Sequence, residues 1–381
     1  MKKIILFAAC IAFLPPLARA ETVAPIDTAA RQAFLLDAST GTPLYNKNGD
    51  ERMTPSSMAK MMTMYLTFEA LKNGKLTLDK ELITSKHAWD QTRKEGGSSM
   101  FLNVGQQARV EDLIRGTVIQ SGNDAAIVLA ETLGGSEPAF ADMMNAKARE
   151  LGLTNTHFVN ATGIPDPDQY STAHDLAVLA LALIRDYPEY YHYFSEMSFK
   201  FNNIDQGNRN PLLYRKMDVD GLKTGHTDDG GYGLTASALR NKRRLIVVIN
   251  GTATMQARAD ESAKVLEWGY REYGSYAIVN AGDHMTDVKV WLGEAPTVPL
   301  MTAQPVLLTL PRTSRVGLKA DISYDQPLPA PIAKGEPIGI LTITAPGMEK
   351  KTYPLIAGAD VPMVGFMQRV EAKLNVFLGR T

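Results

Sequence analysis

Apolar residues recur along the chain with the spacing of buried helices. Near residues 57–68 they cover almost every side of a helix, at Met58, Met61, Met62, Met64, Tyr65, Leu66 and Phe68. A helix that is apolar all round is buried inside a domain. A second apolar stripe covers residues 176–184, and Thr172 and Asp175 before it have the spacing of a capping box. The pattern therefore predicts core helices in both regions.

Strand patterns accompany these helices between residues 31 and 273. Residues 33–37 precede a Ser-Thr-Gly turn that starts a hairpin, and residues 234–239 and 244–250 flank a basic turn. Short apolar runs bounded by turns are typical of paired strands. The mixture predicts an α/β domain, and we place it at residues 21–279.

The pattern changes after residue 279. Short apolar runs at 288–291, 306–310 and 338–343 alternate with Pro- and Gly-rich turns. This alternation predicts a small all-β domain at residues 280–362.

Residues 363–381 return to helical spacing. Seven apolar residues fall on one face, and four charged residues lie mainly elsewhere: Met363, Phe366, Met367, Val370, Leu374, Phe377 and Leu378 against Arg369, Glu371, Lys373 and Arg380. The segment is too short and too charged to span a bilayer. We therefore predict an amphipathic helix that lies in the membrane interface, or that docks on the β-rich domain instead.

The N-terminus has the pattern of a secretory signal peptide. Lys2 and Lys3 precede a short apolar run, and Ala18-Arg19-Ala20 fits the small-x-small rule for cleavage. We predict a signal peptide at residues 1–20, with an uncleaved anchor as the alternative. The chain would then act outside the cytoplasm.

Composition excludes several kinds of chemistry. The 40 basic and 41 acidic residues balance, so net charge gives no indication of nucleic-acid binding. The one cysteine, Cys10, lies in the signal segment, so the mature chain has no thiol nucleophile. The six histidines lack close metal-ligand spacing, which argues against a zinc peptidase and predicts no metal and no cofactor: His87, His157, His174, His192, His226 and His284.

Ser57-Met58-Ala59-Lys60 is an S-x-x-K motif. Residues three apart on a helix are neighbours, so the spacing places a hydroxyl beside an amine. A lysine in an apolar helix loses hydration, which lowers its pKa and leaves a neutral amine able to accept the serine proton. The motif alone also fits a solvated lysine on a surface turn, but the apolar residues around it argue against that.

Two further elements lie downstream. Ser121-Gly122-Asn123 separates two apolar helical runs, where its side chains can face a cleft or simply cap a helix. Lys223-Thr224-Gly225 follows a strand-like run from Val219, where a cation and a hydroxyl could bind a carboxylate and the glycine would let a ligand backbone approach. The alternative is an exposed strand end. His226 comes next and could tune such a site.

The three elements together, in this order, are the signature of penicillin-recognising serine enzymes. The sequence resembles the D-alanyl-D-alanine carboxypeptidases of the penicillin-binding protein 5/6 type. The resemblance covers nearly the whole mature chain and includes residues 55–63, 120–126, 160–163 and 221–227, and Arg258 followed by Glu261-Ser262. It implies a serine β-lactamase/transpeptidase-like α/β (α+β) fold, with a mostly antiparallel sheet flanked by helices.

The resemblance also implies a role for each motif residue. Ser57 would be the nucleophile and Lys60 its base, with Ser121 relaying protons. The peptide amide would bind Asn123, and the backbone N–H groups of Ser57 and His226 would form the oxyanion hole. Substrate binding would involve Asn123, Lys223, Thr224, Gly225, His226 and Arg258, with Arg258 holding the terminal carboxylate. The expected substrate is a peptidoglycan stem peptide ending in D-Ala-D-Ala, and β-lactams would acylate Ser57.

Other readings of the same motifs stay open. A class A-type β-lactamase has a glutamate in E-x-x-L-N between the second and third elements, and residues 121–223 contain no such motif. A D,D-endopeptidase and a non-catalytic β-lactam sensor remain alternatives. We expect a periplasmic enzyme attached to the outer face of the inner membrane by its C-terminal helix.

Overall fold

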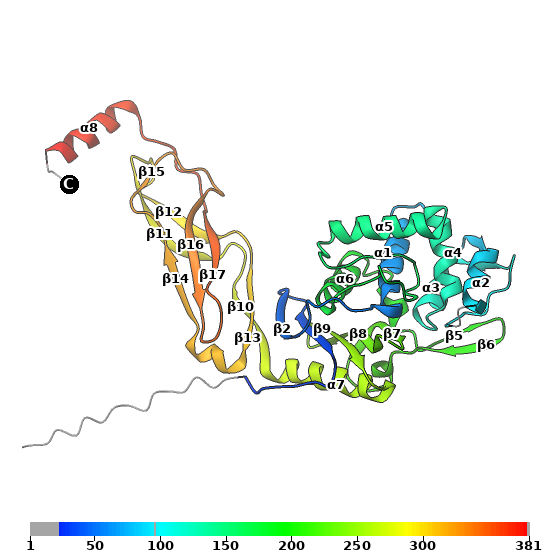
Figure 1. Cartoon of the computed structure of the whole chain (residues 1–381). Helices are drawn as coiled ribbons and strands as arrows, with labels where there is room; N and C mark the ends of the chain where they lie inside the picture. The colour runs from blue at the N-terminus through cyan, green and yellow to red at the C-terminus, as the bar shows by residue number, and fades with distance from the viewer. Residues whose placement is uncertain (1–22, 95–96, 379–381) are drawn as a thin grey trace, which may run out of the picture. The chain divides into compact units, whose positions relative to one another are not determined.

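The computed structural model describes residues 23–94 and 97–378 (Figure 1). The predicted signal peptide and Arg380 lie outside these residues. By their internal contacts the described residues divide into two compact units. One comprises Pro25–Ile278 with Leu307–Thr309, and the other comprises Val279–Val306 and the chain from Leu310 onward. The three motifs all lie in the first, which we call the catalytic unit.

A five-stranded antiparallel sheet forms the centre of the catalytic unit, in the order β2-β1-β9-β8-β7. Its strands are β1 (Gln32–Asp37), β2 (Thr42–Lys47), β7 (Val219–Thr227), β8 (Gly231–Arg240) and β9 (Arg243–Thr252). The predicted hairpin around the basic turn is β8–β9, with Arg240 paired to Arg243. Strand β7, which contains the K-T-G element, lies at the edge of this sheet.

Helices lie on both faces of the sheet. Helix α7 (Met255–Glu272) packs on β8 and β9 from one side, and α6 (Ala173–Asp186) packs on β9 and β1 from the other (Figure 1). Helix α1 (Lys60–Lys72) is surrounded by further helices, which explains why almost all its side chains are buried: α3 (Val110–Val118), α4 (Asn123–Gly134), α5 (Glu137–Glu150) and α6.

The remaining elements of this unit are short. They are α2 (Lys86–Lys94), the hairpins β3–β4 (Glu81–Ile83, Gln107–Arg109) and β5–β6 (Ser198–Phe201, Ile204–Gly207), and the 3-10 turns η1 (Ser56–Ala59), η2 (Tyr191–Ser195) and η3 (Pro211–Tyr214).

The predicted capping box before α6 forms only in part. The Thr172 hydroxyl accepts the Asp175 backbone N–H at 2.9 Å, as expected of an N-cap. The Asp175 carboxylate does not return to the cap, because it accepts the Asn155 N–H and the Thr156 hydroxyl instead. This carboxylate thus ties the start of α6 to the preceding loop.

The second unit is built on a six-stranded sheet in the order β14-β16-β17-β12-β11-β15. Its strands are β11 (His284–Trp291), β12 (Thr297–Thr302), β14 (Lys319–Ser323), β15 (Leu328–Pro329), β16 (Pro337–Thr344) and β17 (Lys351–Ala357), and the 3-10 turn η4 is Arg312–Gly317. Strands β10 (Tyr273–Val279) and β13 (Val306–Pro311) pair as a separate two-stranded sheet. The chain ends in α8 (Phe366–Phe377). The predicted fold class is confirmed, including the all-β region and the terminal helix.

Candidate active site

The S-x-x-K residues lie where a 3-10 turn meets a buried helix. Ser57 belongs to η1, and α1 begins at Lys60, so the pair does not share one regular α-helix as the spacing predicted. A 3-10 turn has three residues per turn, so side chains three apart are aligned with one another. Lys60 Nζ accordingly lies 3.1 Å from Ser57 Oγ.

Lys60 is completely buried. Its amine donates to Asn123 Oδ1 at 2.7 Å and to the Thr162 carbonyl at 2.5 Å, in addition to Ser57. Burial, helped by the positive charge of Arg209, lowers the pKa of Lys60 to about 7. Near neutral pH a substantial fraction of the amine is therefore uncharged and able to accept the proton of the adjacent hydroxyl.

The S-x-N element forms the break between α3 and α4. Ser121 has a positive φ of 65°, and α4 begins at Asn123. The Ser121 hydroxyl is buried and has no hydrogen-bond partner within the described part of the chain. A buried hydroxyl without a partner is costly, so a group of a bound substrate is its natural partner.

The K-T-G residues lie within β7, which continues beyond them to Thr227. Lys223 is buried, and its amine donates to the Thr224 carbonyl at 3.1 Å. Burial, followed by the nearby charges of Lys60, Arg209 and Arg258, lowers the pKa of Lys223 well below its usual value. The His226 side chain is exposed and stacks on Tyr232, with ring centroids 3.9 Å apart.

Gly225 lies where β7 packs against the turn η1. A Cβ at this position would lie 3.1 Å from both the Pro55 carbonyl oxygen and Ser56 Cβ. Glycine thus lets β7 pack closely against η1, and so fixes the strand beside the serine. We had expected the glycine to admit a ligand backbone, and the structure shows this additional, internal contact.

A cavity of about 500 Å³ brings these elements together. Its walls include six of the predicted site residues: Ser57, Ser121, Thr224, Gly225, His226 and Arg258. Lys60, Asn123 and Lys223 do not line it, but Lys60 contacts it through Ser57. We call this cavity the catalytic cleft.

The cleft also contains residues that the sequence analysis missed. Arg209 and Tyr232 line it, and the Arg209 guanidinium donates to the Ser98 hydroxyl. The Thr162 carbonyl accepts a hydrogen bond from the Lys60 amine. These residues belong to no motif of fixed spacing, and only the fold brings them to the serine. The resemblance at 160–163 was the one available signal for Thr162.

Two cations face the cleft. Burial lowers the pKa of Arg258 to about 10, and its Nε has no partner among the described residues. Arg209 is the second cation, and burial lowers its pKa as well. Buried guanidinium groups with free donors are suited to a carboxylate. The cleft therefore combines a hydroxyl that lies beside a buried amine with two cations.

Fold and cleft together define the class of penicillin-recognising serine peptidases, in which a serine paired with a lysine attacks an amide. Comparison with known families identifies the chain more closely. Residues 19–254 match the family model for D-alanyl-D-alanine carboxypeptidase, and residues 273–363 match the C-terminal domain of penicillin-binding protein 5. The chain therefore belongs to the D-alanyl-D-alanine carboxypeptidase family.

Relatives and solved structures agree. The chain is 40% identical to D-alanyl-D-alanine carboxypeptidase DacC of Escherichia coli K12, over 92% of this chain and 88% of that protein. It is 37% identical to DacA of Haemophilus influenzae, over 91% and 89%. Penicillin-binding protein 5 from Haemophilus influenzae superposes with a TM-score of 0.82 at 38% identity, covering 90% of this chain and all of that one. The chain is a serine D,D-carboxypeptidase.

Proposed function

We propose that Ser57 is the nucleophile and Lys60 the base that activates it. The observation that carries this proposal is the Lys60 amine, which is buried, 3.1 Å from Ser57 Oγ, and has a pKa lowered to about 7. The neutral amine takes the hydroxyl proton as Oγ attacks the carbonyl carbon of the D-Ala-D-Ala amide. The C–N bond then breaks, the leaving D-alanine amine takes up a proton, and water hydrolyses the acyl-enzyme.

The other site residues have supporting roles in this proposal. Ser121, whose hydroxyl is free, relays the proton toward the leaving amine. Asn123 positions the Lys60 amine, because its Oδ1 accepts a hydrogen bond from Nζ. Its Nδ2 is then the group that binds the peptide amide. The oxyanion lies between the backbone N–H groups of Ser57 and His226. Thr224 and Gly225 form the strand wall along which the substrate lies, and the buried Lys223 lies behind them in the same strand.

The unpaired cations favour a carboxypeptidase over an endopeptidase. The substrate of a carboxypeptidase carries a free terminal carboxylate next to the scissile amide, whereas an endopeptidase does not need to bind a chain end. Arg258 and Arg209 both line the cleft, and Arg258 retains a buried donor without a partner. β-Lactams, which carry a carboxylate beside a strained amide, would acylate Ser57 by the same route.

Replacing Arg258 tests this assignment. We expect Arg258→Ala to lower kcat/KM for a peptide ending in D-Ala-D-Ala by about 100-fold, because a charge-assisted hydrogen bond to its carboxylate is lost. The measurement is the rate of D-alanine release from the free-acid peptide and from its C-terminal amide. The variant should affect the acid strongly and the amide little.

The matched control is Arg149→Ala, which removes an exposed arginine from α5. It should leave both rates unchanged. Equal losses of rate on the acid and the amide in Arg258→Ala would show that Arg258 does not bind the carboxylate. An unchanged rate on the acid would show that Arg258 takes no part in the site.

We further propose that the protein acts in the periplasm, held on the outer face of the inner membrane by α8, with residues 280–362 as a spacer. Within the described residues, no helix combines the length and apolar character needed to span a bilayer. The apolar side chains of α8 are nevertheless exposed, with Phe366 at 69% and Phe377 at 86%. An uncovered apolar face of this kind suits the membrane interface, where Arg369 and Lys373 would meet anionic headgroups.

Removing this helix should release the enzyme. We expect a chain ending at Pro362 to move from the membrane pellet to the soluble fraction, while D-alanine release from soluble peptides stays within about twofold of the full chain. Fractionation and the peptide assay check the two parts separately. A matched full-length variant, Lys319→Ala in β14 of the same unit, should stay in the pellet. Retention of the truncated chain in the pellet would disprove the anchor.

A further inference from the structure

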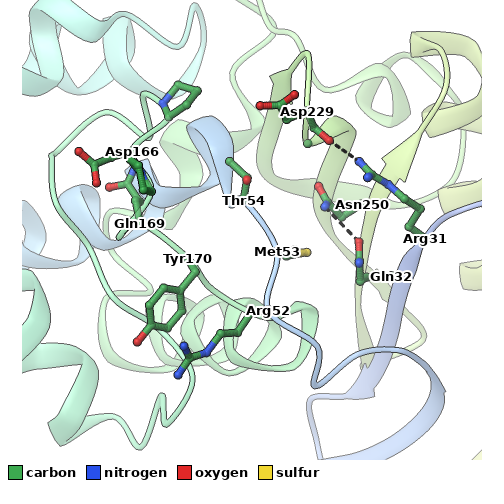
Figure 2. Close-up of a pocket in the computed structure, with 13 residues that line it drawn as sticks. Arg31, Gln32, Arg52, Met53, Thr54, Asp166, Gln169, Tyr170, Asp229 and Asn250 are labelled. Atoms are coloured by element: carbon green, nitrogen blue, oxygen red, sulfur yellow. Dashed lines mark hydrogen bonds between the residues drawn. The ribbon is translucent and has the colours of Figure 1, made fainter.

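A second cavity lies in the catalytic unit, apart from the catalytic cleft. It has a volume of about 540 Å³, and its walls include Arg31, Arg52, Thr54, Tyr170, Asp229 and Asn250 (Figure 2). It shares no lining residue with the catalytic cleft. Five separate parts of the chain form it: the start of β1, the segment before η1, the loop at 165–170, the β7–β8 turn and the end of β9. We call it the lower cavity.

The lower cavity begins a short distance from the nucleophile. Thr54 precedes Ser57 by three residues, and Asp229 follows His226 by three. Three residues span at most about 11 Å even when fully extended. Gly230 of the lower cavity lies close to the residue before the nucleophile, because a Cβ built on it would come within 3.3 Å of Ser56 Oγ. A peptide bound at Ser57 can therefore reach this space with two or three further residues.

Two arginines of the lower cavity keep free donors. Arg31 donates one N–H to the Asp229 carbonyl at 2.7 Å, and the Arg52 guanidinium lies 4.0 Å above the Tyr170 ring (Figure 2). Among the described residues, neither guanidinium forms an ion pair with a carboxylate. A guanidinium has five N–H donors and binds a carboxylate through two of them. The contact with the Tyr170 ring uses the face of the Arg52 guanidinium, so the N–H groups at its edge stay available to a ligand.

One residue that lines the lower cavity has a buried side chain. Asn250 is 1% exposed, and its Nδ2 donates to Gln32 Oε1 at 3.3 Å. Its Oδ1 is buried without a partner among the described residues, and Figure 2 shows this oxygen on the side away from Gln32. This oxygen lies against Gly233 of β8, where an added Cβ would come within 2.6 Å of it, so it faces the sheet rather than the open space of the cavity.

The lower cavity is not a site for a polyanion. Asp166 and Asp229 line it together with the two arginines, which makes it formally neutral. Asp166 is partly satisfied, since its Oδ1 accepts the Asp168 N–H at 2.9 Å. Cations and carboxylates in one cavity suit a peptide segment that carries both a carboxylate and an ammonium group.

We propose that the lower cavity binds the acyl side of the stem peptide, the part that remains on the enzyme after D-alanine leaves, through the carboxylate of its acidic residue. This inference rests on the proposed role of Ser57. In a stem pentapeptide the acidic residue lies two positions before the D-alanine that becomes attached to the serine, which matches the reach of the cavity. The site makes the enzyme prefer a natural stem over a shorter or amidated one.

A pair of peptides tests the proposal. One is L-Ala-γ-D-Glu-meso-diaminopimelyl-D-Ala-D-Ala, and the other carries D-isoglutamine in place of D-glutamate, so that only the acidic carboxylate differs. We expect the full-length enzyme to prefer the acid by about tenfold in kcat/KM, the value of one charge-assisted hydrogen bond. In Arg31→Gln and in Arg52→Gln the ratio of the two values should fall toward one.

The outcomes separate this inference from the proposed function. Arg149→Ala, far from both cavities in the sequence and exposed on α5, should keep the wild-type ratio. Acylation by penicillin, measured for each variant, reports an intact catalytic cleft without involving the acidic residue. A ratio near one in the wild-type enzyme, or a ratio unchanged in both arginine variants, would overturn the lower-cavity site. If the wild-type enzyme released no D-alanine from either peptide, that result would instead overturn the proposed function.

Discussion

Replacing Ser57 by alanine should abolish both D-alanine release and covalent labelling by penicillin. Among the described residues, this is the one hydroxyl that accepts a hydrogen bond from the Lys60 amine, at 3.1 Å. Loss of the nucleophile in a serine enzyme lowers kcat by a factor on the order of 10⁶. The checks are a D-alanine assay and mass spectrometry of the protein after incubation with penicillin.

The neighbouring serine provides a matched control. Ser56 is buried, and its hydroxyl pairs with Thr227 Oγ1 at 3.1 Å rather than with a base. Ser56→Ala should therefore still form the penicillin adduct. An adduct of normal mass in Ser57→Ala would show that another serine is the nucleophile, and Ser121, which also lines the catalytic cleft, would be the next to examine.

Replacing Lys60 by methionine should have the second largest effect. Methionine has a similar length and fills the buried site, but it cannot accept a proton. Removal of a general base costs about 10² to 10⁴ in rate. We expect acylation by penicillin and D-alanine release to fall together by this factor, since both begin with the attack of Ser57.

The pH dependence of the unmodified enzyme tests the same assignment. The pKa of Lys60 is lowered to about 7, and the amine is a base only when neutral. The rate constant for acylation should therefore rise as pH increases through about 7 and level off above it, and Lys60→Met should lose this rise. A flat profile across neutral pH would mean that a different group activates Ser57.

The main features of the fold and of the reacting pair could be predicted from the sequence because they depend on local patterns. Ser57 and Lys60 are three residues apart, and apolar residues around them predict burial. The strands on either side of the basic turn are likewise local, and they appear as β8 and β9. Such features need no knowledge of how distant segments meet.

Features that depend on distant segments could not be predicted in the same way. Arg209 reaches the catalytic cleft from a polar loop before η3, and the Thr162 carbonyl reaches Lys60 across 102 residues of sequence. The role of Gly225 depends on η1, which lies far away in the chain. The start of α1 at Lys60, after a 3-10 turn, also escaped the pattern, because an i, i+3 spacing fits both helix types.

The burial of Lys60 has a consequence for the stability of the whole catalytic unit. In the unfolded chain this amine has its ordinary pKa of 10.5, whereas in the folded protein the value is about 7. At pH 7 the amine is fully protonated in the unfolded chain and about half protonated in the folded protein, so folding releases about half a proton, and the lowered pKa opposes folding by on the order of 4 kcal/mol. The penalty is fully present below pH 7 and fades as pH rises toward 10.5. The residue that makes the enzyme reactive is thus one that weakens it, and the densely packed helices around α1 must supply the compensating free energy. Mutations that loosen that packing, even far from Ser57, would lower the free energy of unfolding of the catalytic unit, because less packing energy would then offset the burial of Lys60.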